Sequence, residues 1–90
     1  MLFRSDILQE ECAEVIQAVS KISRFGIDNH KPGKPKTNRE HLEEELGDLQ
    51  AMIHLLIENK IVDAQKVENA AIKKKIKLLN WSSISFENDK

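Results

Sequence analysis

The sequence predicts an all-α fold, a small bundle with three main helices. Its 90 residues include three glycines, two prolines and 4% aromatic residues, which are too few turn and strand formers for a β-protein. Apolar residues recur at alternating spacings of four and three in two long segments, and a third segment has a similar apolar side. A chain of this length forms one domain, so residues 1–90 are predicted to be a single helical domain.

The first helix is predicted over about residues 6–24. Ser5 is its expected N-cap, and Gly26 is expected to end it in a left-handed conformation. Its apolar stripe comprises Leu8, Cys12, Val15, Val19 and Ile22. The next segment, about residues 25–36, is rich in turn formers and carries Lys31, Lys34 and Lys36. It is long for a helix connection in so small a domain, and long loops are often functional.

The second helix is predicted from the capping box at Thr37 and Glu40 to about Glu58. Its stripe comprises Leu42, Leu46, Leu49, Ile53 and Leu56. Most other positions between 49 and 57 are also apolar, so we expect this helix to be covered on more than one side. Asp63 is the expected cap of a third helix that ends near Asn80, and the polar tail 82–90 is expected to be flexible.

Net charge, hydropathy and cysteine content exclude several classes of function. A formal net charge of −1 provides no general attraction to nucleic acid or to a membrane. No apolar run is long enough to span a bilayer, and the N-terminus lacks a signal-peptide pattern. The single Cys12 cannot form an intrachain disulfide, which agrees with a reducing compartment. We therefore expect a cytoplasmic protein without a membrane or nucleic-acid partner.

Two acid clusters are the main functional signal. Glu11 and Glu14 lie three residues apart on the first helix, and Glu45 and Asp48 have the same spacing on the second. On a wheel of about 100° per residue, the inner acids Glu11 and Glu45 lie about 55–60° from the centre of the apolar stripe. The outer acids lie about 115–120° away. An antiparallel hairpin would bring the four carboxylates to one edge of its seam.

The simpler interpretation is that these acids belong to solvated helix faces. It is weakened because both clusters adjoin the apolar seam and because neither inner acid has a lysine or an arginine three or four positions away. A carboxylate quartet is stable only with positive charge among its members, which indicates a metal ion. Iron sites in helical bundles use Glu-x-x-His, and here the third-position partners are Glu14 and Asp48. Oxygen ligands favour Mg²⁺, Mn²⁺ or Ca²⁺, and Mg²⁺ bound by carboxylates usually accompanies a phosphate substrate.

Glu-Glu-x-x-Glu at residues 10–14 and Glu-x-x-Asp at 45–48 resemble the MazG-like all-α nucleoside triphosphate pyrophosphohydrolases. The resemblance covers residues 7–26 and 37–56 well and the third helix loosely. It implies hydrolysis of (deoxy)nucleoside triphosphates to monophosphate and pyrophosphate, with Mg²⁺ as cofactor and Mn²⁺ as a possible substitute. The metal ligands that it implies are Glu11, Glu14, Glu45 and Asp48.

The resemblance also suggests roles for other residues. Glu10 becomes a candidate for orienting the attacking water, and Glu10 or Glu14 for accepting its proton. Relatives use groups of the last helix on the phosphates, for which the candidates are Lys73, Lys77 and Asn80. Many relatives have a further helix before the first acid helix. A three-helix chain would then be an incomplete bundle, which a homodimer or homotetramer would complete.

Two other functions stay open at this stage. Phosphoribosyl-ATP pyrophosphohydrolase uses the same acids on another nucleotide, so a comparison of substrates would separate it from a triphosphate pyrophosphohydrolase. A non-catalytic helical interaction or regulatory module would not be stabilised by Mg²⁺ or Mn²⁺, whereas a metal enzyme would. The histidines His30, His41 and His54 are assigned surface or structural roles.

Overall fold

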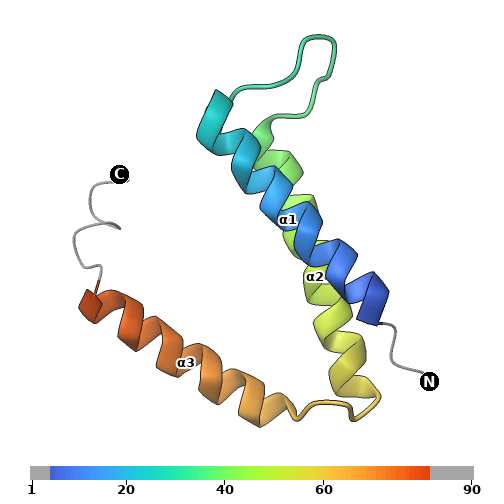
Figure 1. Ribbon diagram of the computed structural model, residues 1–90, viewed down its shortest axis with the longest axis vertical. Coiled ribbons are helices and arrows are strands. Elements are labelled where there is room, and N and C mark those ends of the chain that lie inside the picture. The colour runs from blue at the N-terminus through green and yellow to red at the C-terminus, as the bar shows by residue number, and fades with distance from the viewer. Residues whose placement is uncertain (1–4, 82–90) are drawn as a thin grey trace.

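The computed structural model describes residues 5–81, which form three helices: α1 (Ser5–Phe25), α2 (Asn38–Glu58) and α3 (Ala64–Trp81) (Figure 1). Within that range the structure has no strand beyond one isolated bridge between His30 and Thr37. The all-α prediction is therefore confirmed. The predicted flexible tail 82–90 lies outside the described residues.

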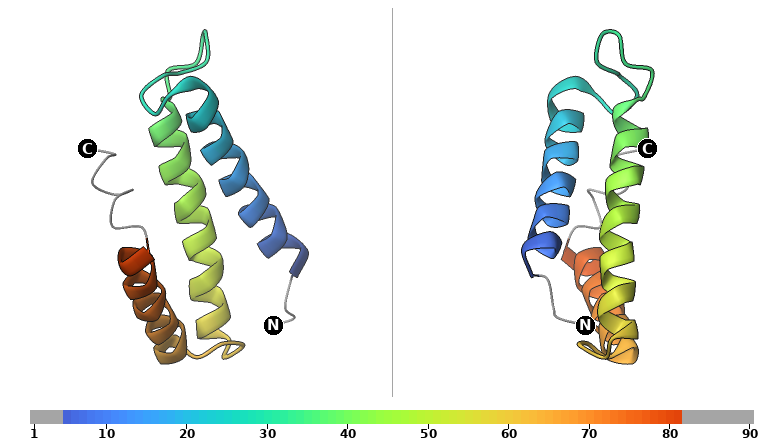
Figure 2. Two further views of the ribbon diagram at one scale, coloured as in Figure 1. Left: turned by 60° about the vertical axis from the view of Figure 1, so that its left-hand side comes forward. Right: turned by 90° about the vertical axis from the view of Figure 1, so that its right-hand side faces the viewer.

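Helices α1 and α2 form the predicted antiparallel hairpin, and they pack side by side along most of their length (Figure 2). Their seam is rotated from the predicted stripes by about one position. Cys12 and Val19 of α1 are exposed, while Glu11 is half-buried and Ala18 is buried. We attribute the rotation on α1 to the small side chain of Ala18, which allows the two backbones to approach closely.

The second helix shows the same rotation. Leu46, predicted to lie in the seam, is 46% exposed, whereas the neighbouring Glu45 is only 8% exposed. Leu56 is buried as predicted. Leu55 is 40% exposed, so one chain alone does not cover α2 on a second side as expected from its apolar composition. In both helices the inner carboxylate lies in the seam itself rather than beside it.

Local hydrogen bonds fix the ends of the hairpin. Gly26 has a φ of 92°, and its N–H donates to the carbonyl of Ile22, as expected for the residue that ends α1. Thr37 and Glu40 form the predicted capping box at the start of α2. The predicted N-cap Ser5 is instead the first residue of α1, a difference within the usual uncertainty of helix boundaries.

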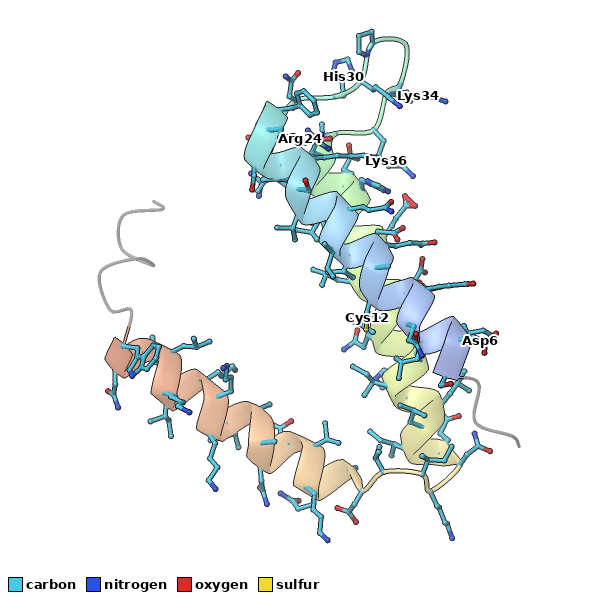
Figure 3. All side chains as sticks on the ribbon, viewed as in Figure 1. Asp6, Cys12, Arg24, His30, Lys34 and Lys36 are labelled. Atoms are coloured by element: carbon cyan, nitrogen blue, oxygen red, sulfur yellow. The ribbon has the colours of Figure 1, made fainter. Side chains whose placement is uncertain are left out.

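The loop between the helices is tied to α2. Asn38 donates a side-chain hydrogen bond to the carbonyl of Gly26, and Arg39 forms an ion pair with Asp28. His30 and Lys34 lie on the part of the loop farthest from the helices (Figure 3). The hairpin is thus closed by specific contacts at the loop end.

Helix α3 points away from the hairpin and packs little against it (Figures 1 and 2). The link to α2 is well defined, because Lys60 adopts a left-handed φ of 59° and the predicted cap Asp63 accepts a hydrogen bond from the N–H of Lys66. The fold extends 42 × 36 × 16 Å, and along the shortest of these directions α1 lies in front of α2 (Figure 1). Several apolar side chains of α3 are exposed in one chain, among them Ile72, Ile76 and Leu79.

No helix in the part of the chain that the structure describes is both long enough and apolar enough to cross a membrane.

Candidate metal centre

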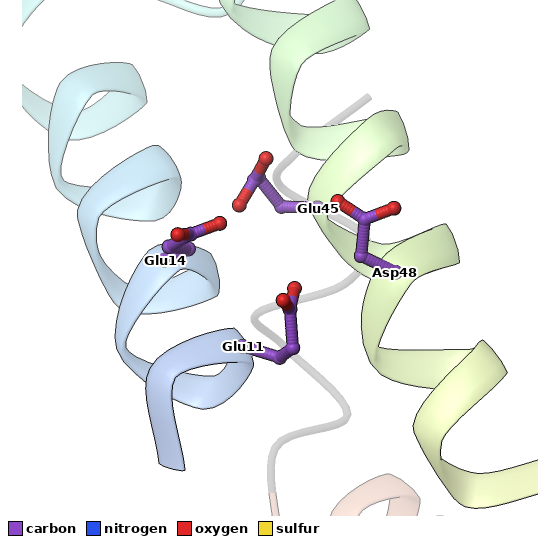
Figure 4. A group of neighbouring side chains, drawn as sticks. All are labelled: Glu11, Glu14, Glu45 and Asp48. Atoms are coloured by element: carbon purple, nitrogen blue, oxygen red, sulfur yellow. The ribbon is translucent and has the colours of Figure 1, made fainter. Parts of the chain in front are cut away.

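Four carboxylates meet across the seam of the hairpin. Glu11 and Glu14 come from neighbouring turns of α1, and Glu45 and Asp48 from neighbouring turns of α2 (Figure 4). Each offers one carboxylate oxygen, and these oxygens all lie within 4.8 Å of one another. The structure therefore brings together all four residues that the sequence resemblance implied as metal ligands. We call this group the acid cluster.

The acid cluster is partly withdrawn from water. Glu45 is 8% exposed and Glu11 is half-buried, while Glu14 and Asp48 lie at the open side. The Oε2 atoms of Glu11 and Glu45 are buried, and within residues 5–81 they have no hydrogen-bond partner. A buried carboxylate oxygen without a partner is costly, so these atoms favour a bound positive group.

The electrostatics of the acid cluster favour protonation when no cation is bound. A hydrogen bond with Glu14, burial, and the charges of Glu14, Asp48 and Glu11 raise the pKa of Glu45 from 4.5 to about 7. Burial and the charges of Glu14, Asp48 and Glu10 raise the pKa of Glu11. Crowded carboxylates resist losing all their protons unless another positive charge replaces them.

The donor set fits a hard divalent cation. All four ligands offer oxygen, which suits Mg²⁺, Mn²⁺ or Ca²⁺ better than softer metals. The two unpartnered buried oxygens come from different helices, as expected when one ion bridges the hairpin. The geometry therefore supports a metal centre at the acid cluster.

The other predicted residues lie outside this cluster. Glu10 is exposed and adjacent to Glu11 on α1. Lys73, Lys77 and Asn80 are exposed on α3, which does not pack over the acid cluster within one chain. The predicted substrate-binding residues are therefore not brought to the acid cluster by a single subunit.

Sequence reasoning missed one neighbour of the cluster. The Nε2 atom of His41 lies 3.8 Å from Oε1 of Glu45, one helical turn away on α2. His41 had been assigned a surface or structural role. His41 lies four residues before Glu45, and this spacing could have identified it as a neighbour of the acid cluster.

The match to a family model decides the family. The model of the MazG nucleotide pyrophosphohydrolase domain matches residues 5–80, almost the whole described chain. The chain belongs to the MazG family. Comparison of this MazG domain with curated proteins and with solved structures found no match. The family match confirms the resemblance expected from the acid motifs, and it suggests nucleotide pyrophosphohydrolase activity.

Proposed function

We propose that this MazG domain is a Mg²⁺-dependent nucleotide pyrophosphohydrolase that converts (deoxy)nucleoside triphosphates to monophosphate and pyrophosphate. The observation that carries the proposal is the acid cluster: four carboxylate oxygens from two helices within 4.8 Å, in a chain of the MazG family. Mn²⁺ would substitute for Mg²⁺, because both accept carboxylate oxygens.

In the proposed reaction, water attacks the α-phosphorus, and the bond from this phosphorus to the oxygen bridging to the β-phosphorus breaks. The departing pyrophosphate takes the electron pair of that bond. Glu11, Glu14, Glu45 and Asp48 would hold the cation, which when bound neutralises phosphate oxygens and makes water more acidic. Glu10 or Glu14 would accept the proton of the attacking water.

Glu10 and Glu14 are suited to this role for different reasons. Glu14 belongs to the acid cluster and is exposed to solvent, so a water beside the ion can reach it. Glu10 is exposed on the adjacent position of α1 and carries no ion pair within the described residues. A carboxylate that reaches solvent can take and release a proton.

We further propose that the active protein is a homodimer or a homotetramer. Exposed apolar side chains on α3, and the small contact of α3 with the hairpin of its own chain, support this assembly. The Cα radius of gyration is 15.8 Å, whereas a compact chain of this length has about 12 Å. Assembly would also allow Lys73, Lys77 and Asn80 of one subunit to approach the acid cluster of another.

A substrate panel tests the function directly. Purified protein is incubated with Mg²⁺ and each common nucleoside or deoxynucleoside triphosphate, and with phosphoribosyl-ATP, and released pyrophosphate is measured. We expect pyrophosphate from at least one free triphosphate and its loss in Glu11→Gln. Glu43→Gln, an exposed acid of α2 outside the acid cluster, is the matched control. Absence of pyrophosphate with every nucleotide would refute the function, and full activity of Glu11→Gln would refute the site.

A further inference from the structure

Positive charge is scarce around the acid cluster. Acidic side chains far outnumber basic ones on α1 and α2. One divalent cation cannot balance four carboxylates and a triphosphate together, so the phosphates need further positive groups. Lys73 and Lys77 lie on α3, which one chain keeps away from the acid cluster. Within one chain, a positive group for the phosphates must therefore come from the hairpin itself.

Three basic side chains of the hairpin are already engaged. Arg39 forms an ion pair with Asp28, and Lys36 forms one with Glu44. Arg24 donates to the carbonyl of Ser20, and its guanidinium lies over the ring of Phe25. Lys21 differs from these residues. Its side chain is half-buried, and among residues 5–81 no hydrogen bond or ion pair engages its ammonium.

Lys21 lies on the same face of α1 as Glu14. The two residues are seven positions apart, which rotates them by only about 20° and separates them by about 10 Å along the helix. Side chains of a helix lean toward its N-terminus, so the stem of Lys21 leans toward Glu14. This placement depends on one helix alone and needs no second subunit.

His41 lies between them on the opposite helix. Glu14 faces Glu45 across the antiparallel seam. His41 precedes Glu45 by four positions, so it lies level with Ala18, which is between Glu14 and Lys21 on α1. The side chain of His41 is 33% exposed, with Nε2 3.8 Å from Glu45. In the direction from the acid cluster to the loop, His41 therefore comes first and Lys21 second.

We propose that Lys21 binds the pyrophosphate end of the substrate, and that His41 lines the path from the acid cluster to Lys21. This inference rests on the proposed function and adds the direction in which the triphosphate lies: its α-phosphate at the acid cluster and its terminal phosphates toward the loop end of the hairpin. The ammonium of a half-buried lysine that has no partner among residues 5–81 is a suitable group for a phosphate oxygen.

Binding of pyrophosphate tests the proposal separately from turnover. Calorimetry with inorganic pyrophosphate and Mg²⁺ compares wild-type protein with Lys21→Met, Lys21→Arg and the α3 control Lys66→Met. We expect Lys21→Met to bind at least about tenfold more weakly, while Lys21→Arg and Lys66→Met stay within about threefold of the wild type. The affinity for Mn²⁺ alone should fall in none of them, because Lys21 is not a metal ligand.

A second measurement covers the possibility that Lys21→Met folds poorly. Acetylation of lysines in the wild-type protein, read by mass spectrometry, should slow at Lys21 but not at Lys66 when Mg²⁺ and pyrophosphate are added. Equal pyrophosphate affinity of wild type and Lys21→Met, or no protection of Lys21, would overturn the proposal. If either result came with normal wild-type turnover, the proposed function would stand. Absence of turnover in the wild type would instead refute that function.

Discussion

Glu14 of α1 and Glu45 of α2 face each other across the hairpin seam, with a carboxylate oxygen of each within 4.8 Å of the other. Two ionised carboxylates this close repel each other, and the pKa of the buried Glu45 is raised to about 7. The acid cluster thus has two ways to reduce its repulsion: it keeps a proton, or it binds a cation. Protonation and cation binding therefore compete for the acid cluster.

Replacing Glu45 with glutamine should stabilise the metal-free protein. The amide has nearly the same shape, removes one of four crowded charges and can donate to Glu14 without a proton from solvent. In buffer with a chelator at about pH 8, we expect Glu45→Gln to raise the free energy of unfolding by about 1 kcal/mol or more. Urea unfolding measures this change. The control Glu43→Gln should stay within about 0.5 kcal/mol of the wild type, and a loss of stability in Glu45→Gln would contradict the repulsion.

The metal-free protein should lose stability as pH rises through the titration of Glu45. Its pKa is about 7 in the folded protein against an ordinary value of 4.5, so between these values the native state holds more protons than the unfolded state. The contribution of Glu45 to the free energy of unfolding therefore falls as pH rises over that interval and is constant above it. Urea unfolding with a chelator, repeated across this range, should show a steeper decline for the wild type than for Glu45→Gln. Parallel profiles would contradict the assignment.

The fold of the hairpin could be predicted because its signals are local. The apolar spacing, Gly26 and the Thr37 capping box each act over a few residues, and each appears in the structure. The acid cluster could be predicted for the same reason, since three-residue spacing fixes neighbours on a helix. The rotation of the seam could not be predicted from the sequence, because it depends on how closely α1 and α2 approach at Ala18. The direction of α3 depends on the turn at Lys60, which no periodicity encodes.

The capping box at the start of α2 should contribute measurably to stability. The side chain of Thr37 accepts a hydrogen bond from the N–H of Glu40, whose own carboxylate accepts one from the N–H of Thr37. Thr37→Ala removes the first of these bonds and should lower the free energy of unfolding by about 1 kcal/mol. Thr37→Ser keeps the hydroxyl and should lose much less. Equal stability of the two variants would show that the cap has no role in holding α2.

Gly47 offers a test of what packs against the outer side of α2. A methyl group added there would meet nothing within 4 Å in one chain. A glycine within a helix costs about 1 kcal/mol relative to alanine, so we expect Gly47→Ala to raise the free energy of unfolding by about that amount. Thermal unfolding and analytical ultracentrifugation should be measured together. A loss of both stability and assembly would instead place a helix of a second subunit against Gly47.

The most direct test of the central claim is the binding of Mn²⁺ by the acid cluster, measured by calorimetry on the protein without nucleotide. We expect the wild type to bind Mn²⁺, with an affinity that falls as pH drops below about 7 because protons compete for Glu45. Glu11→Gln and Glu45→Gln should each bind at least about tenfold more weakly, while Glu43→Gln should bind like the wild type. Absence of Mn²⁺ binding by the wild type, or unchanged affinity in both cluster variants, would contradict a metal centre at these four carboxylates.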